Sequence, residues 1–238
     1  MKCVSAEKLA YYDKKLKEFV FGKYVSKEAG KGLSTNDFTD DWKKKIEDLA
    51  YEEIVITAFS NSKNMVEIGT TVTEVSISWT INKTPKSLKL DGADVEVTET
   101  SKVFVGQSIT ADKTYSLVAT DERGASSAKT TKISFLNGVY WGVGAASATL
   151  DNAFILGLTK GLQSSKAKTF TVTAGAGEHI YYALPARYGT PGFNVGGFDG
   201  GFGKAGTVEF TNASGHTEQY DVWKSTNASL GGTTVKVS

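Results

Sequence analysis

The stretch VSISWTI, residues 75–81, decides the fold class because apolar and polar side chains alternate along it. Every second position is apolar: Val75, Ile77, Trp79 and Ile81. A β-strand directs successive side chains to opposite faces, so this pattern predicts a strand with one buried face. Trp79 lies on the apolar side, and we therefore predict that its ring belongs to the core of a β-sandwich.

Similar short segments surround this strand over residues 54–135. Strands are predicted at residues 88–90, 95–97, 103–105, 115–119 and 131–135, with turns at Asp91-Gly92 and Arg123-Gly124. Short strands with no helical pattern between them indicate an antiparallel sandwich of the immunoglobulin or fibronectin kind. Cys3 is the one cysteine of the chain, so this sandwich would lack an internal disulfide.

A third region, residues 136–238, is rich in glycine and aromatic residues and begins at Asn137-Gly138. Strands are predicted at residues 170–174, 179–184, 208–211, 220–223 and 235–237. We predict a second β-sandwich here, so the fold class is mainly β: a short N-terminal helical segment, an immunoglobulin-like sandwich and a C-terminal sandwich.

Residues 1–53 have a helical period instead. One predicted helix carries the apolar stripe Leu9, Tyr12, Leu16 and Phe19, and a second, over residues 39–52, carries Trp42, Ile46 and Leu49. Each stripe is short. It suits a helical bundle between chains, giving a homo-oligomer with a trimer favoured, but it equally suits packing against the β-domain of the same chain.

The charge balance argues against several partners. Twenty-seven basic and 26 acidic residues leave a net charge of +1, and no basic cluster predicts nucleic-acid binding. The first ten residues lack the apolar core of a signal peptide, and the weakly polar run at residues 135–150 is too short to span a bilayer. We expect synthesis in the cytoplasm without membrane insertion.

One motif raises the question of a nucleotide. GFGKAGTV, residues 201–208, contains Gly201, Gly203 and Gly206 at the G-x-G-x-x-G spacing. A dinucleotide site needs a helix after the glycines, whereas the residues after Gly206 alternate as a strand does. We therefore expect no cofactor, and we interpret residues 192–206 as a long glycine loop pinned by its phenylalanines.

Residue types that commonly serve in catalysis or metal binding give little support for an enzyme. No Gly-x-Ser-x-Gly elbow occurs, and His179 and His216 have no partner at metal-ligand spacing, so we expect neither catalytic nor metal-binding residues. Arg187 is predicted to pair with a loop carboxylate such as Asp199 or to contact a ligand.

Aromatic side chains are the remaining candidates for recognition. The candidate ligand or receptor surface comprises Trp141, Tyr188, Phe193, Phe198, Phe202 and Trp223. Aromatic rings give rigid contact area with a polar edge, which suits sugar stacking. The alternative, that most of these rings are core residues of a small sandwich, stays open.

Three stretches resemble bacteriophage tail-fibre, baseplate and related appendage proteins: GKGLSTNDFTDDWKKKIEDLA, then VTEVSISWTINKTPKSLKLDG with TYSLVATDERGASSAKTTKISF, then LPARYGTPGFNVGGFDGGFG with FTNASGHTEQYDVWKSTNASLGGTTVKVS. The resemblance implies a non-enzymatic virion protein of a tail fibre, baseplate or head fibre, with other virion proteins as partners and a host surface glycan or protein as a further one. It brings no catalytic residue. The alternative is a bacterial surface adhesin or carbohydrate-binding module.

Overall fold

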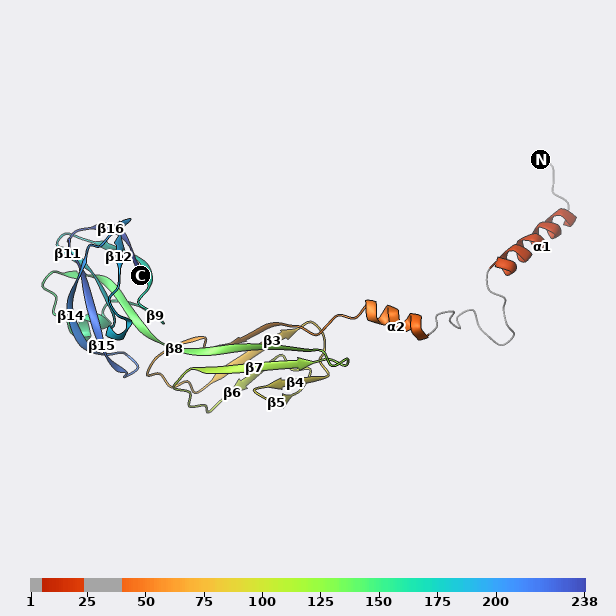
Figure 1. Ribbon diagram of the computed structural model, residues 1–238, viewed down its shortest axis with the longest axis horizontal. Helices are drawn as coiled ribbons and strands as arrows, with labels where there is room; N and C mark the ends of the chain where they lie inside the picture. The colour runs from red at the N-terminus through yellow and green to blue at the C-terminus, as the bar shows by residue number, and fades with distance from the viewer. Residues whose placement is uncertain (1–5, 24–39) are drawn as a thin grey trace. The chain divides into compact units, whose positions relative to one another are not determined.

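The computed structural model describes the backbone of residues 6–23 and 40–238 (Figure 1). The chain divides into two compact units, Met1–Glu52 and Glu53–Ser238. The first contains the helices α1 (Ala6–Lys23) and α2 (Asp40–Leu49), at the places where the apolar stripes predict them. The second is built from antiparallel sheets, so the predicted mainly β fold class is confirmed.

The N-terminal part of the second unit is an immunoglobulin-like sandwich of two sheets. One sheet has the order β1-β3-β6, from Ile56–Asn61, Val75–Ile81 and Ser101–Phe104. The other has the order β8-β7-β4-β5, from Ser126–Ala145, Lys113–Thr120, Ser87–Leu90 and Ala93–Val95. A short strand, β2 (Met65–Glu67), runs parallel to β8.

The core of this sandwich follows the predicted alternation. Val75, Ile77 and Trp79 are buried, and the alternating residues Ser76, Ser78 and Thr80 lie on the other face. The Trp79 ring is 4% exposed, and its indole Nε1 donates a 2.8 Å hydrogen bond to the Glu99 carbonyl. The predicted position of Trp79 in the core is therefore confirmed.

Turn chemistry explains the hairpins of this sandwich. Asp91 and Gly92 both have positive φ, 50° and 80°, as a two-residue turn between β4 and β5 requires. The expected strand at residues 95–97 differs, because β5 ends at Val95, whose register partner Leu88 is near the start of β4. Val97 still packs against the core without strand pairing.

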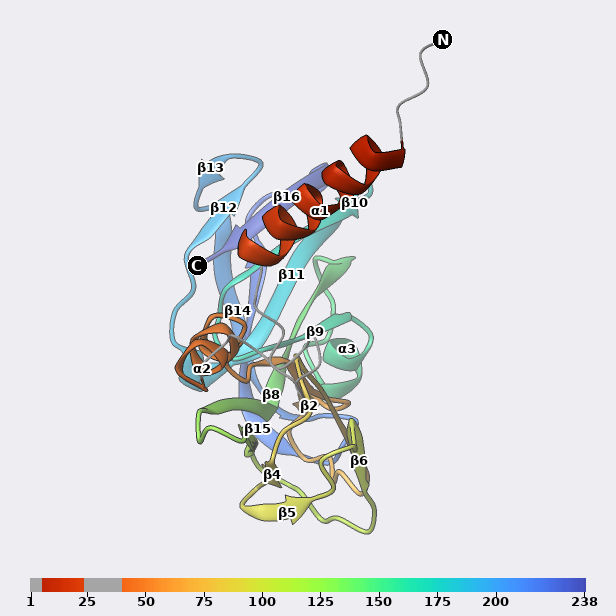
Figure 2. The ribbon, with the colours of Figure 1, turned by 90° about the vertical axis from the view of Figure 1, so that its right-hand side faces the viewer.

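The C-terminal sandwich has a large and a small sheet. The large one joins β14 (Phe202–Thr211), β15 (Thr217–Ser225), β11 (Glu178–Pro185) and the second half of β8. The small one has the order β10-β16-β12-β13, from Lys168–Ala174, Gly231–Val237, Phe193–Val195 and Phe198–Asp199. The strands β10, β11 and β16 run close together in Figure 2.

Strand β11 is buried on both faces, which explains its continuous apolar run. Ile180, Tyr182 and Leu184 belong to the core shared with the small sheet. Tyr181 and Ala183 belong to a second core, to which helix α3 (Asn152–Leu156) contributes Ile155. The strand β9 (Thr159–Gln163) extends the large sheet along β8, and a 3₁₀ turn, η1 (Ala186–Tyr188), follows β11.

Strand β8 takes part in both sandwiches. It pairs with β7 up to Ile133 and with β11 from Tyr140 onward, so the predicted boundary between residues 135 and 136 falls inside one strand. Asn137-Gly138, expected to open a new region, is buried mid-strand. Asn137 Nδ2 donates to Glu218 at 2.7 Å, and the Gly138 carbonyl accepts from the Tyr220 hydroxyl at 2.8 Å. These bonds hold the pair in the sheet.

Side chains of β2 and the loop after it reinforce this connection. Glu67 forms a 2.9 Å ion pair with Lys160 of β9, and the Ile68 carbonyl accepts from Asn212 Nδ2 at 2.8 Å. The Thr70 and Ser214 hydroxyls are 2.8 Å apart. Residues of the first sandwich are therefore bonded directly to a strand and a loop of the second.

Position 138 requires glycine because the Tyr140 ring lies close to its Cα, and not because the chain turns there. A Cβ built there would lie 2.8 Å from Tyr140 Cε2 and 2.9 Å from Tyr140 Cζ. The Tyr140 ring cannot move freely, because it packs edge-on against Phe210 with 5.1 Å between centroids. We expect Gly138→Ala to lower the free energy of unfolding by about 1–3 kcal/mol, as overpacking of a core does.

Urea denaturation followed by circular dichroism measures this loss. Gly203→Ala is the matched control, since Gly203 also lies in a strand but a Cβ there meets no atom within 4 Å. Equal unfolding midpoints for the two variants would contradict the packing explanation.

The glycine-rich stretch at residues 192–206 is not the single long loop that we predicted. It forms the β12–β13 hairpin and then enters β14 at Phe202. Glycines with positive φ make the two turns, at Gly196-Gly197 and Gly200-Gly201. Gly203 and Gly206 lie within β14, at a register shift beside Lys204, so glycine here accompanies a bulge.

Candidate functional site

A depression in the C-terminal sandwich brings together three of the predicted surface aromatics. It has a volume of about 690 Å³, and Phe193, Phe202 and Trp223 line it. The backbone of the turns on either side, including Gly192 and Gly200, completes the wall. Ligand sites of proteins commonly have this size and an apolar lining with a few polar groups. We call this depression the aromatic pocket.

The aromatic rings of this pocket are held by the core. Phe193 is 8% exposed and stacks on Phe202, with 4.1 Å between centroids and 6° between planes. Trp223 lies 5.8 Å from Phe193 at 46°. Inward, Phe193 meets Tyr182 edge-on at 6.0 Å, and Tyr182 stacks on Phe170. The rings that line the pocket are therefore positioned by a ladder of buried aromatics.

Polar side chains of three neighbouring strands reach the same pocket. Asn194 of β12 is the register partner of Lys236 in β16 and of Asp199 in β13. Directly opposed residues of paired strands share a face of the sheet, which explains why all three line the pocket. Asn194 Nδ2 donates to Asp199 Oδ1 at 2.7 Å, and Asn194 Oδ1 accepts from the Gly197 amide at 3.2 Å.

Several polar groups of the pocket are unpaired. Among the residues that the structure describes, the Lys236 ammonium, the second carboxylate oxygen of Asp199 and the buried indole Nε1 of Trp223 have no hydrogen-bond partner. The pocket therefore offers free donors and a free acceptor beside a fixed amide.

The other predicted surface aromatics lie elsewhere. Trp141 is half-buried on β8, stacked on Phe170 at 5.5 Å and covered by Lys168, whose Nζ is 4.9 Å from the indole centroid. Phe198 is 82% exposed in β13 and does not line the pocket. Tyr188 follows β11, and its hydroxyl donates to the Gln163 carbonyl at 2.8 Å. Three of the six residues thus converge, and three do not.

Two tyrosines fasten the segment before β10. The Tyr182 hydroxyl donates to the Lys166 carbonyl at 2.8 Å, beside the bond from Tyr188 to Gln163. Burial raises the pKa of both phenols above the usual value, so they stay protonated donors at any physiological pH. Their role is structural.

We predicted that Arg187 pairs with a loop carboxylate such as Asp199. In the structure it pairs with Glu218 of β15 instead. That hydrogen bond raises the pKa of the Arg187 guanidinium, which also lies 5.2 Å from the Tyr188 ring centroid. Glu218 also accepts a hydrogen bond from Asn137 of β8, so its carboxylate links η1 and β8 to β15. The predicted pairing with a loop carboxylate is therefore wrong, because Glu218 lies in a strand.

The histidines occupy structural positions. His179 Nδ1 lies 2.7 Å from the Ser225 carbonyl, and the His216 amide donates to Asn212 Oδ1 in the turn before β15. Among the side chains that the structure describes, no three His, Cys, Asp or Glu residues gather as metal ligands. In the same part of the chain, none of the helices has the length and apolar character needed to cross a membrane.

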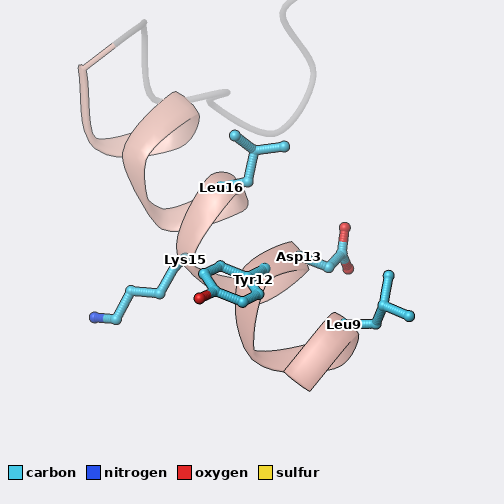
Figure 3. Close-up of a pocket in the computed structure, with 5 residues that line it drawn as sticks. All are labelled: Leu9, Tyr12, Asp13, Lys15 and Leu16. Atoms are coloured by element: carbon cyan, nitrogen blue, oxygen red, sulfur yellow. The ribbon is translucent and has the colours of Figure 1, made fainter. Parts of the chain in front are cut away.

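A second candidate surface is the apolar stripe of α1. Leu9, Tyr12 and Leu16 are each more than 60% exposed, and Asp13 and Lys15 border them (Figure 3). On α2, Ile46 and Leu49 are also exposed. The side chains of Phe19 and Trp42, which complete the two predicted stripes, lie outside the described residues.

Comparison with known proteins identifies no family. No family model matches the chain, and no curated protein does. Two solved structures show weak similarity. The eight N-terminal immunoglobulin domains of Down syndrome cell adhesion molecule isoform 1.30.30 match at a TM-score of 0.24 and 8% identity, over 74% of this chain and 23% of that one. Chitinase ChiA74 from Bacillus thuringiensis matches at a TM-score of 0.23 and 11% identity, over 94% of this chain and 29% of that one. Neither similarity carries an argument about fold or function.

Proposed function

We propose that this chain is a non-enzymatic structural protein of a phage or prophage virion, a component of a tail fibre, baseplate or head fibre. Copies assemble through the N-terminal helices, most simply as a trimer, and join other virion proteins. The β-sandwiches supply a stable scaffold, and the C-terminal one contacts a host surface glycan or protein. The sequence resemblance to appendage proteins supports this function.

The observation that carries the proposal is the exposed stripe of α1. Leu9, Tyr12 and Leu16 have the 3-4 spacing of core positions in a coiled coil. An 18-residue helix with its apolar face in water is only marginally stable alone. A bundle of identical helices buries this face, which gives the helix the partner that its pattern requires.

Charges beside the stripe suit association of identical, parallel helices. In the heptad that places Leu9 and Leu16 at the a position, Lys8 is at g and Asp13 at the following e position. Residues at g and the next e face each other across a parallel coiled coil, so Lys8 of one copy meets Asp13 of another. Opposite charges at these positions favour such an assembly.

We expect the full chain to have the mass of a trimer in sedimentation equilibrium and the Leu9→Ser/Leu16→Ser variant to have the mass of a monomer. Each substitution removes an apolar contact of the bundle but leaves the β-sandwiches unchanged. Tyr11→Ser is the matched control, because Tyr11 is 59% exposed on the same helix but outside the stripe. A monomeric full chain, or a variant that stays oligomeric, would reject assembly through α1.

A second candidate function is a bacterial surface adhesin or carbohydrate-binding module, which the aromatic pocket favours. Neighbouring genes separate the two: tail and lysis genes support the virion role, and a cluster for secreted glycan use supports the adhesin.

A further inference from the structure

We propose that the aromatic pocket binds a neutral saccharide through Phe202, Trp223, Asn194, Asp199 and Lys236. This inference rests on the host-contact part of the proposed function and deepens it by naming the ligand class and its residues. It is carried by the convergence of aromatic rings and available polar groups in one depression of about 690 Å³.

The apolar half of the pocket suits the C–H face of a sugar ring. Phe202 and Trp223 are both partly exposed, and both line the depression. An aromatic face is electron-rich, and the C–H groups of a pyranose carry the complementary partial charge. Phe202 is already fixed by its parallel stack on Phe193, so little conformational entropy is lost when a ligand covers it.

The polar half suits sugar hydroxyls. A hydroxyl donates one hydrogen bond and accepts others, and it therefore needs both kinds of partner. The free oxygen of Asp199 accepts, and the Lys236 ammonium donates. Asn194 holds Asp199 in place through the 2.7 Å bond, so the acceptor is oriented before the ligand arrives. Asp199 and Lys236 line the same pocket as Phe202 and Trp223, so a sugar that stacks on the rings can also bond these polar groups through its hydroxyls.

Charge decides between neutral and anionic ligands. Asp199 and Lys236 are the two ionisable side chains among the residues that line the pocket, and their charges cancel. A phosphate or uronate would meet the Asp199 carboxylate as well as the ammonium, with no arginine to bind it in bidentate fashion. Nor does the pocket use a helix N-terminus, because its walls are strands and turns. A neutral saccharide fits best.

The test titrates the ¹⁵N-labelled full chain with neutral oligosaccharides of glucose, galactose, mannose, rhamnose and N-acetylglucosamine, and with a uronate oligosaccharide for comparison. We expect at least one neutral sugar to shift the amides of residues 192–202, 223 and 236 in a saturable way. Calorimetry then gives the dissociation constant.

Three variants probe the two halves of the pocket, each judged against a control. Asp199→Ala and Lys236→Ala should each weaken binding about tenfold, the size of a lost hydrogen bond to a charged group. Phe202→Leu should weaken it by a similar factor, because it keeps apolar volume but removes the ring. Glu209→Ala, an exposed carboxylate on β14, and Phe198→Leu, an exposed ring outside the pocket, should bind as the unmodified chain does.

Several outcomes would overturn this inference: no saturable shift with any neutral sugar at high millimolar concentration, shifts confined to other residues, binding of the uronate alone, or equal affinity in variants and controls. The mass of the assembly separates it from the proposed function. A trimer that binds no sugar refutes the saccharide site alone, whereas a monomer that binds sugar refutes the assembly role.

Discussion

Trp79→Ala should lower the free energy of unfolding by about 3–5 kcal/mol, the cost of removing a buried aromatic ring and leaving a cavity. Trp79 lies on β3 among fully buried aliphatic residues, and the variant also leaves the Glu99 carbonyl without its indole donor. A domain of this kind has a net stability of only about 5–15 kcal/mol. We therefore expect a marginally folded protein with a much lower urea midpoint.

Val103→Ala supplies the control for this measurement. Val103 lies on β6 of the same sheet but is 54% exposed, so its truncation should cost less than about 0.5 kcal/mol. If Trp79→Ala unfolds at the same urea concentration as Val103→Ala, the ring does not contribute to the core as its burial indicates.

Tyr182→Ala should have an effect of similar size, about 3–5 kcal/mol, in the C-terminal sandwich. The side chain is 0% exposed, and its ring stacks on Phe170 at 5.6 Å and meets Phe193 edge-on at 6.0 Å. Loss of this ring removes the middle of the ladder that positions the aromatic pocket. Differential scanning calorimetry should show a lowered transition temperature.

Tyr182→Phe divides this effect into its parts. It keeps the ring and removes the hydroxyl bond to the Lys166 carbonyl, so it should cost about 1 kcal/mol. Should the phenylalanine variant lose as much stability as the alanine variant, the hydroxyl and not the stacked ring would be the main contribution.

The fold was predictable where burial is one-sided. In β3, apolar residues alternate with polar ones, and this pattern predicts both the strand and its buried face, which contains Val75, Ile77 and Trp79. In β11, Tyr181 and Tyr182 both face a core, so no alternation exists to read, but the strand predicted at residues 179–184 still matches β11, Glu178–Pro185. Gly138 was misleading, because an Asn-Gly pair commonly marks a turn, whereas here the glycine makes room for the Tyr140 ring.

The candidate site was predictable only in its aromatic part. The sequence signal was the presence of large aromatic residues in a glycine-rich region with little charge, and it includes Phe193, Phe202 and Trp223. Asn194 and Lys236 give no such signal, because their convergence depends on the register between β12 and β16. Register is fixed by tertiary packing and not by a local pattern. Arg187 illustrates the same limit, since its partner is Glu218 and not Asp199 of the glycine-rich stretch.

The continuity of β8 has a consequence for recombination. A crossover at the predicted boundary between residues 135 and 136 would cut a strand that pairs with β7 on one side of the cut and with β11 on the other. A foreign sandwich joined there would have to supply a strand in the right register and the partners of Lys160 and Asn212 as well. We therefore expect a recombinant to fold when it exchanges Glu53–Ser238 as one unit, and not when it exchanges one sandwich alone.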